Sequence, residues 1–177
     1  KLSRIKVATT NKGREEKKGL TRLDSNKTIV PLLPMFERHV QTFVDLGFPL
    51  NTATIIFPAK QELSESTVAI TGLKSEEKWI GIAPFAQYET KVYPFDLMQQ
   101  VVKLLATYSY KVFLFGGGTE EIALLEQLKQ SNPNSIVIAG KLSFKEELQL
   151  ISNLDVMLSM DSGNGHIAAM FGVKVIA

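Results

Sequence analysis

The fold is decided by the stretch Leu158-Ser159-Met160-Asp161-Ser162-Gly163-Asn164-Gly165-His166-Ile167-Ala168, in which an apolar strand passes through a glycine-rich turn into a helix. A strand that ends at Leu158-Ser159 brings an acid, a hydroxyl and two glycines to the helix start, where the first backbone N–H groups lack helical partners. Such a terminus carries partial positive charge and attracts phosphate. The stretch therefore predicts a phosphorylated ligand.

The composition is that of an ordinary globular domain, since 45% of the 177 residues are hydrophobic and 21% are charged. No apolar run reaches the roughly 20 residues needed to cross a bilayer, and no leader is visible, so we expect a cytoplasmic protein. The chain has no cysteine, which excludes disulfides and thiolate chemistry. Its two histidines argue against a histidine-rich zinc site, and we predict no metal.

The first 27 residues are strongly basic, with nine Lys or Arg against three acids, whereas the whole chain has a net charge of +2. A basic segment can face an anionic acceptor, a membrane surface or nucleic acid, or it can be a solvated surface. No aromatic residue interleaves these charges before Phe36, which disfavours a stacking platform for single strands. We therefore predict no nucleic-acid partner.

From Trp79 onward, apolar strands alternate with amphipathic helices. We predict strands at residues 79–83, 111–115, 136–139, 156–158 and 173–176. The helices between them start at Pro94, at a Thr119 N-cap, at a Ser143–Glu146 capping box and at the glycine-rich turn. Nearly continuous apolar strands joined by helices predict an α/β fold with a parallel sheet covered on both faces.

The first 75 residues do not follow this repeat. Residues 5–9 resemble a strand, residues 37–46 a helix that ends at Gly47, and residues 51–58 an extended segment. Residues 60–75 read as a polar connection. Because the chain opens in one strand-like run and stops in another, we expect a piece of a longer protein.

The residues that follow the strands are candidate ligand contacts, because open parallel sheets bind ligands beyond the carboxyl ends of their strands. Lys91 can give an ammonium to a phosphate, or it is a plain surface lysine. Glu120 or Glu121 can accept ribose hydroxyls, or they serve the helix dipole. Asp161 is costly to bury unless it is paired, and Lys91 is one partner for such a buried pair. His166 faces the ligand, or it is a structural histidine of the interior.

Two general phosphate-binding motifs are alternative interpretations of the glycine-rich segments. A P-loop needs Lys followed by Ser or Thr after its glycines, and neither residues 116–119 nor the later turn has this pair. The stretch 163–168 satisfies the dinucleotide fingerprint G-x-G-x-x-A, although it lies in the fourth strand-helix unit rather than the first. A nucleotide-dependent oxidoreductase therefore stays open as an alternative.

Five motifs in register carry a family resemblance. They are Ile80-Gly81-Ile82-Ala83-Pro84, Lys91-Val92-Tyr93-Pro94, Val112-Phe113-Leu114-Phe115-Gly116-Gly117, Ala139-Gly140-Lys141-Leu142-Ser143 and Asp161-Ser162-Gly163-Asn164-Gly165-His166-Ile167-Ala168-Ala169. Together they resemble the carboxyl-terminal domain of glycosyltransferase family nine, the ADP-heptose:lipopolysaccharide heptosyltransferases. Residues 11–18 and 37–48 are more loosely similar to the end of that family's amino-terminal domain.

The resemblance implies a GT-B fold of two Rossmann-like domains, truncated here at both ends. Residues 1–75 would be a remnant of the acceptor-side domain and its linker, and residues 76–177 an incomplete donor-binding domain. The parent would transfer a sugar, with heptose as the family's example, from a nucleoside-diphosphate donor such as ADP-heptose to a lipopolysaccharide-type acceptor. Family members invert the anomeric carbon and need no metal or other cofactor. The partners implied are the nucleotide sugar, a glycolipid or saccharide acceptor, and peripheral contact with the inner membrane.

Carried onto matching positions, the resemblance gives roles to individual residues. The diphosphate and sugar would contact Lys91, the ribose Glu120 or Glu121, and the base Leu142. The phosphate and sugar would also meet the turn, that is, Asp161, Ser162, Gly163, Asn164, Gly165 and His166. At Ala86-Gln87 some members instead offer hydroxyls to phosphate. The general base is expected in the missing amino-terminal part, so we predict a fragment without transferase activity; a non-catalytic sugar-nucleotide-binding module is the other alternative.

Overall fold

The computed structural model describes residues 5–18, 20 and 31–177. The chain divides into two compact units, Lys1–Ile55 and Ile56–Ala177. Each unit is described here by itself. Much of the basic segment at residues 1–27 lies outside the described residues.

The first unit contains two helices, α1 (Arg14–Lys18) and α2 (Met35–Leu46). Helix α2 begins two residues before the predicted start and ends as predicted at Gly47, whose φ of 93° is in the left-handed region. The predicted strand at residues 5–9 is wrong: these residues are irregular, and Ile5 and Val7 are exposed. No described segment pairs with them, and a strand forms only where a neighbour takes up its backbone hydrogen bonds.

A buried arginine holds the first unit together. The Arg38 guanidinium donates to the carboxylate of Glu16 on α1, to the Leu33 carbonyl at 2.9 Å and to the Asn11 carbonyl at 3.3 Å. These bonds hold the pKa of Glu16 below its usual value, chiefly through the hydrogen bond from Arg38. A polar contact, rather than an apolar core, therefore joins α1 to α2.

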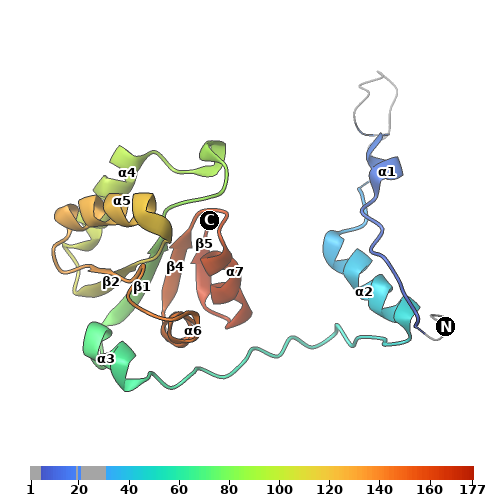
Figure 1. The fold of residues 1–177 in the computed structure, drawn as a ribbon, viewed down its shortest axis with the longest axis horizontal. Coiled ribbons are helices and arrows are strands. Elements are labelled where there is room, and N and C mark those ends of the chain that lie inside the picture. The colour runs from blue at the N-terminus through green and yellow to red at the C-terminus, as the bar shows by residue number, and fades with distance from the viewer. Residues whose placement is uncertain (1–4, 19, 21–30) are drawn as a thin grey trace. The chain divides into compact units, whose positions relative to one another are not determined.

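The second unit is a five-stranded parallel sheet, as predicted (Figure 1). Its strands are β1 (Lys78–Ala83), β2 (Tyr110–Leu114), β3 (Ile136–Val137), β4 (Val156–Ser159) and β5 (Lys174–Ile176). The strand order is β3-β2-β1-β4-β5, and every neighbouring pair is parallel. The chain thus builds outward from β1 to β3 and then crosses back to place β4 on the other side of β1. The third strand is shorter than the predicted 136–139.

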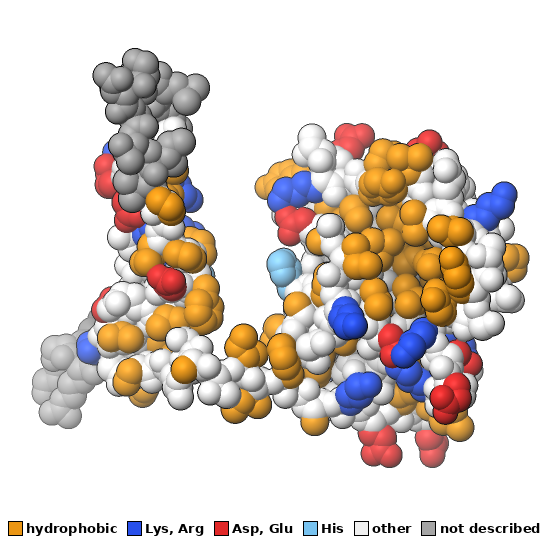
Figure 2. Space-filling model, turned by 180° about the vertical axis from the view of Figure 1, so that it is seen from behind, with side chains coloured by type: hydrophobic (Ala, Val, Ile, Leu, Met, Phe, Trp, Pro, Cys, Tyr) orange, Lys and Arg blue, Asp and Glu red, His pale blue; other side chains and the backbone are white. Residues whose placement is uncertain are grey.

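Helices cover both faces of the sheet (Figure 1). They are α3 (Glu65–Thr71), the 3-10 turn η1 (Glu89–Lys91), α4 (Phe95–Leu105), α5 (Gly118–Ser131), α6 (Phe144–Ser152) and α7 (Gly163–Met170). Side chains alternate along β1, so Ile80 and Ile82 pack in one core cluster with α4 and α5, and Trp79 packs in the other with α6 and α7. Large apolar side chains also remain on the surface of this unit (Figure 2). The exposed ones include Leu73, Phe144, Met170 and Ile176.

Two helix starts depart from the predictions. Helix α5 begins at Gly118 with Gly117 as N-cap, not at a Thr119 cap, because the Glu121 carboxylate accepts the Gly117 N–H at 2.8 Å. The segment 60–75 is not only a polar connection, since it contains helix α3.

The capping box of α6 is confirmed: Ser143 Oγ accepts from the Glu146 N–H, and the Glu146 carboxylate accepts from the Ser143 N–H at 2.8 Å.

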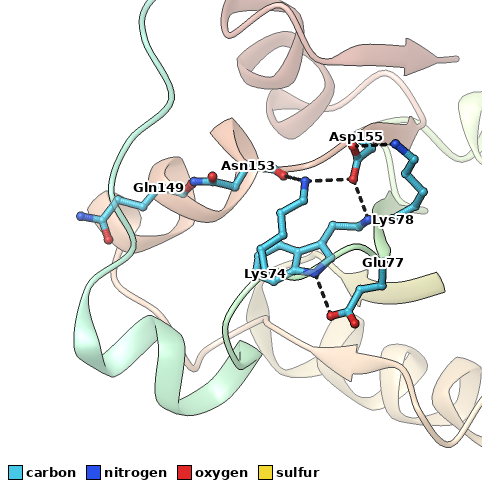
Figure 3. Close-up of polar contacts among 7 residues, drawn as sticks. Lys74, Glu77, Lys78, Gln149, Asn153 and Asp155 are labelled. Atoms are coloured by element: carbon cyan, nitrogen blue, oxygen red, sulfur yellow. Dashed lines mark hydrogen bonds and ion pairs between the residues drawn. The ribbon is translucent and has the colours of Figure 1, made fainter. Parts of the chain in front are cut away.

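Polar contacts attach the segment around α3 to the sheet. Lys74 donates to the Asn153 carbonyl at 2.5 Å and to Asp155 at 2.9 Å, while Lys78 lies 3.6 Å from the other Asp155 oxygen (Figure 3). Asp155 also accepts the Trp79 N–H at 2.8 Å. Because these bonds join residues about 80 positions apart, they fix the connection against the start of β4, which local sequence patterns could not reveal.

A second attachment uses the acid of the capping box. The Glu146 carboxylate accepts from Ser66 and from Ser64, both at the start of α3, as well as from Ser143. These hydrogen bonds, that from Ser66 foremost, lower the pKa of Glu146 to about 2. One carboxylate therefore serves the starts of both α6 and α3.

Candidate functional site

The candidate site lies beyond the carboxyl ends of β1, β2 and β4. Strand β1 pairs with β2 on one side and with β4 on the other, so the order in which strands are added to the sheet reverses at this point while all the strands stay parallel. Such switch points form the crevice in which open parallel sheets bind ligands. The loops that follow the first four strands were predicted to meet on one rim. The structure brings those after β1, β2 and β4 together around one cavity, whereas residues 140–142 after β3 are not in its lining.

This cavity has a volume of about 510 Å³. It is lined from four parts of the chain: the loop after β1, the loop after β2, the first turn of α6, and the turn that opens α7. The lining residues are Ala83, Phe85, Ala86, Gln87, Phe115, Gly116, Gly117, Glu121, Glu147, Asp161, Ser162, Gly163 and Asn164. We call it the switch-point cavity.

The start of α7 faces this cavity without a side-chain cap. Ser162 is the N-cap, but no side-chain cap hydrogen bond is present. Its hydroxyl lies 2.9 Å from that of Ser159, which itself donates to the Met160 carbonyl at 2.7 Å. The Ser162 hydroxyl is therefore the donor to Ser159. The first-turn N–H groups of α7 are left for another acceptor.

The two glycines of the turn play different parts. A Cβ on Gly163 would meet no atom within 4 Å, and its φ is not positive, so neither packing nor backbone geometry of this chain requires glycine there. A Cβ on Gly165 would come within 2.6 Å of Ser159 Oγ. Glycine at 165 lets α7 lie close against the end of β4, whereas glycine at 163 keeps the cavity open beside the helix start.

Lys91 and Asp161 form the ion pair that the sequence suggested, but the pair is not buried. About half of each side chain is exposed, and the Lys91 ammonium also lies 5.6 Å from the centre of the Tyr88 ring. The hydrogen bond from Lys91, followed by its charge, holds the pKa of Asp161 below its usual value. Lys91 is thus a cation in partly open solvent, held beside the switch-point cavity by its pair with the lining residue Asp161, and it remains accessible to an anion.

His166 is not an interior histidine. Its side chain is 79% exposed, and its Nε2 lies 3.7 Å from the second oxygen of Asp161. His166, Lys91 and Gly165 line a second cavity of about 460 Å³, and Asp161 and Ser162 line both cavities. The turn 161–162 therefore separates the switch-point cavity from a neighbouring space.

The remaining predicted residues divide into those inside and those outside the lining. Glu121 lines the switch-point cavity, whereas Glu120 is exposed and is absent from its lining. Leu142 is partly buried and packs against the core cluster that contains Ile151, so it is not a lining residue either. Asn164 lines the cavity at the first turn of α7.

Glu147 is a lining residue that the sequence analysis missed. It lies in the first turn of α6, it is half-buried, and burial raises the pKa of its carboxyl group. A signal was present in the sequence: Leu150 and Ile151 are buried, and residues three or four positions before them share their helix face. A charge on the buried face of a helix is unusual and marks a residue for attention.

The described residues contain neither a candidate metal site nor a candidate membrane span. Within these ranges no three His, Cys, Asp or Glu side chains gather closely enough to hold a metal ion. Of the helices that the structure describes, none combines the length and apolar character of a membrane-spanning segment.

The comparison with known sequences decides the family. Residues 4–177 match the sequence model of glycosyltransferase family 9 (heptosyltransferase). The chain belongs to this family. It is 29% identical over 171 residues to lipooligosaccharide heptosyltransferase 2 of Haemophilus influenzae (strain ATCC 51907 / DSM 11121 / KW20 / Rd), and the match covers 89% of this chain. It covers 49% of that relative, so the chain spans about half the length of the curated relative it matches.

Solved structures of the family share the fold. The E. coli heptosyltransferase WaaC with ADP superimposes with a TM-score of 0.61 at 15% identity, covering 84% of this chain and 46% of that chain. A family 9 glycosyl transferase from Veillonella parvula DSM 2008 gives a TM-score of 0.61 at 21% identity, covering 88% of this chain and 44% of that chain. The predicted α/β, Rossmann-like fold of GT-B glycosyltransferases is therefore confirmed.

Proposed function

We propose that the switch-point cavity binds the nucleoside diphosphate of a sugar donor. The observation that carries this proposal is the start of α7: its N–H groups have no side-chain cap, and Gly163 leaves open space beside them. A diphosphate placed there would accept backbone hydrogen bonds and benefit from the helix dipole. Lys91, half-exposed and paired with the lining residue Asp161, would add a mobile positive charge.

The other proposed contacts follow from the lining and from the family. Glu121 uses one oxygen for the Gly117 N–H, which leaves the second to accept ribose hydroxyls. His166 and Asp161 would lie towards the sugar, because both line the second cavity beside the turn. Leu142 is proposed as a base contact from the family resemblance alone, and Glu120 has no supporting contact.

For the parent protein we propose transfer of a sugar, with heptose as the family's example, from an ADP-linked donor to a lipopolysaccharide-type acceptor with inversion. The curated relative is a lipooligosaccharide heptosyltransferase, and one structural neighbour is a heptosyltransferase with ADP. The donor domain stabilises the negative charge that develops on the departing diphosphate, through Lys91 and the helix start. The general base that deprotonates the acceptor hydroxyl belongs to the parent's acceptor-side half, so residues 1–177 should bind donor without turning it over.

We place the parent in the cytoplasm and at the inner membrane surface, where a lipid-linked acceptor would be presented. We also propose that residues 1–75 are the end of the acceptor-side domain with its linker, of which residues 64–74 contact the sheet unit, and that residues 76–177 are the donor domain. The support for the membrane contact is the basic charge of the first 27 residues.

Calorimetric titration of the chain with ADP, UDP, GDP and NAD tests the proposal. We expect ADP to bind and Lys91→Ala to weaken it by about tenfold, the size of one charge-assisted hydrogen bond. Lys103→Ala is the matched control, because Lys103 is an exposed lysine of α4 that lines neither cavity. Preferential binding of NAD, unaffected by Lys91→Ala, would favour the oxidoreductase alternative. Activity of the full-length parent separates a transferase from a non-catalytic binding module.

A further inference from the structure

Glu147 stands out among the acids of the switch-point cavity because nothing within the described residues compensates it. Asp161 is paired with Lys91, and Glu121 accepts the Gly117 N–H. Glu147 is half-buried in the same lining, and no described residue forms a hydrogen bond or an ion pair with its carboxylate; only its backbone N–H is bonded, to the Ser143 carbonyl at 2.9 Å. A carboxylate withdrawn from water without a partner destabilises the protein unless a ligand supplies one.

The helix itself does not account for this position. An acid in the first turn of α6 interacts favourably with the helix dipole, but Glu146 already fills that role through the capping box. An exposed acid would serve the dipole equally well without the cost of burial. The placement of Glu147 on the cavity side of α6 therefore calls for a partner inside the cavity.

The chemistry of a carboxylate limits what that partner can be. An ionised carboxylate accepts hydrogen bonds and repels phosphate oxygens, so Glu147 cannot serve the diphosphate. A nucleoside offers the matching groups, namely ribose hydroxyls and the amino group of the base. We propose that Glu147 is a specificity-determining residue that accepts a hydrogen bond from an O–H or N–H group of the donor's nucleoside. This inference rests on the proposed function and adds a residue that the family motifs do not name.

The test is calorimetric titration of the full chain with ADP, comparing wild type, Glu147→Ala and Glu147→Gln. We expect Glu147→Ala to weaken ADP by about tenfold, since a hydrogen bond to a charged group is lost, and Glu147→Gln to lose less because its amide oxygen still accepts. Glu126→Ala is the matched control, because Glu126 is an exposed acid of α5 outside the lining. The fluorescence of Trp79, the single tryptophan and fully buried, verifies that each variant is folded.

Analogues locate the donor group and provide a readout that a merely structural role would not move. They are 2′-deoxy-ADP, 3′-deoxy-ADP and the diphosphate of purine riboside, which lacks the amino group. One of them should bind wild type about tenfold more weakly than ADP does. For that analogue, Glu147→Ala should cause no further loss of affinity, because the donor group that Glu147 contacts is already missing. A loss for the deoxy compounds identifies a ribose hydroxyl, and a loss for purine riboside identifies the base.

The outcomes separate the two proposals. If wild type binds ADP and Lys91→Ala weakens it, while Glu147→Ala binds ADP as well as or better than wild type, the inference about Glu147 is overturned and the donor site stands. If Glu147→Ala lowers the affinity for ADP and for every analogue by the same factor, the inference is also overturned, because the effect of the substitution is then structural. If wild type binds neither ADP nor an ADP-sugar, the donor site itself is wrong, and the role of Glu147 falls with it.

Discussion

The two glycine-rich junctions of the sheet unit, before α5 and before α7, look alike in sequence and differ in chemistry. At α5 the helix carries acids in its first turn, and Glu121 accepts the Gly117 N–H at 2.8 Å. At α7 no acid lies in the first turn, and the Ser162 hydroxyl is turned toward Ser159. Neither helix start has a side-chain cap, but at α5 a first-turn acid accepts the N–H of the N-cap residue Gly117, whereas at α7 no first-turn side chain does the same, and we propose that an external anion binds there. Glycine makes room for a phosphate at both junctions, and the difference in expected affinity comes from the acids within the first helical turn, which α5 has and α7 lacks.

The largest expected effect comes from making the α7 junction resemble that of α5. Gly163→Asp places a negative charge at the helix start, where a Cβ meets no atom. At the distances of such a site, repulsion of the diphosphate should cost roughly 3 kcal/mol, about a hundredfold in ADP affinity, at an effective dielectric constant near 20. Calorimetric titration with ADP compares this variant with Gly163→Asn, whose side chain has a similar size but no charge. The comparison separates the effect of the negative charge from that of the added volume. Equal ADP affinity of Gly163→Asp and Gly163→Asn would show that the diphosphate does not bind at this helix start.

A smaller effect distinguishes the two glycines within the α7 junction. Gly165→Ala forces a Cβ to within 2.6 Å of Ser159 Oγ, so we expect a loss of about 1–3 kcal/mol in the free energy of unfolding. Gly163→Ala meets no obstacle, and its stability should not decrease. Urea unfolding followed by Trp79 fluorescence measures both. Equal stability of the two alanine variants would contradict the packing role assigned to Gly165.

The smallest effect concerns a third helix start, that of α6, where an acid serves as cap. The pKa of Glu146 is about 2 in the folded chain against an ordinary value of 4.5, so its contribution is complete above about pH 5 and is lost as pH falls towards 2. Glu146→Gln should lower the urea midpoint at neutral pH and flatten its decline in acid. Glu126→Gln, at an exposed position, serves as control. If the urea midpoint of Glu146→Gln falls in acid as steeply as that of wild type, this role of Glu146 is contradicted.

Features that depend on residues close in sequence were predictable. The capping box of Ser143 and Glu146 is complete within four positions, and the apolar strands need only their own residues to be recognised. The meeting of Lys91 with Asp161 followed from the rule that strand ends share one edge of a parallel sheet. What this rule could not supply was the half-exposure of the pair, which depends on how the loops fill the rim.

Features that depend on distant partners were missed. Residues 5–9 have strand-like composition, but composition cannot supply a neighbouring strand. Helix α3 is stabilised by contacts across some 80 residues, through Ser64 and Ser66 to Glu146. The start of α5 is a different case, because it was mispredicted although the interaction is local: the Glu121 carboxylate accepts the Gly117 N–H four residues back, and Gly117 rather than Thr119 is the N-cap. In the candidate site, the place of Glu147 on the buried face of α6 was readable from the sequence, but the packing of α6 that brings this face to the cavity was not.

The buried Arg38 has a consequence for calorimetric unfolding. In the described part of the first unit the only buried side chain is this guanidinium, whereas the buried apolar side chains among the described residues all lie between residues 79 and 168. The heat capacity of unfolding rises with the apolar surface that becomes exposed to water. Melting of the first unit should therefore add little to the heat-capacity step of the chain, which will report almost entirely on the sheet.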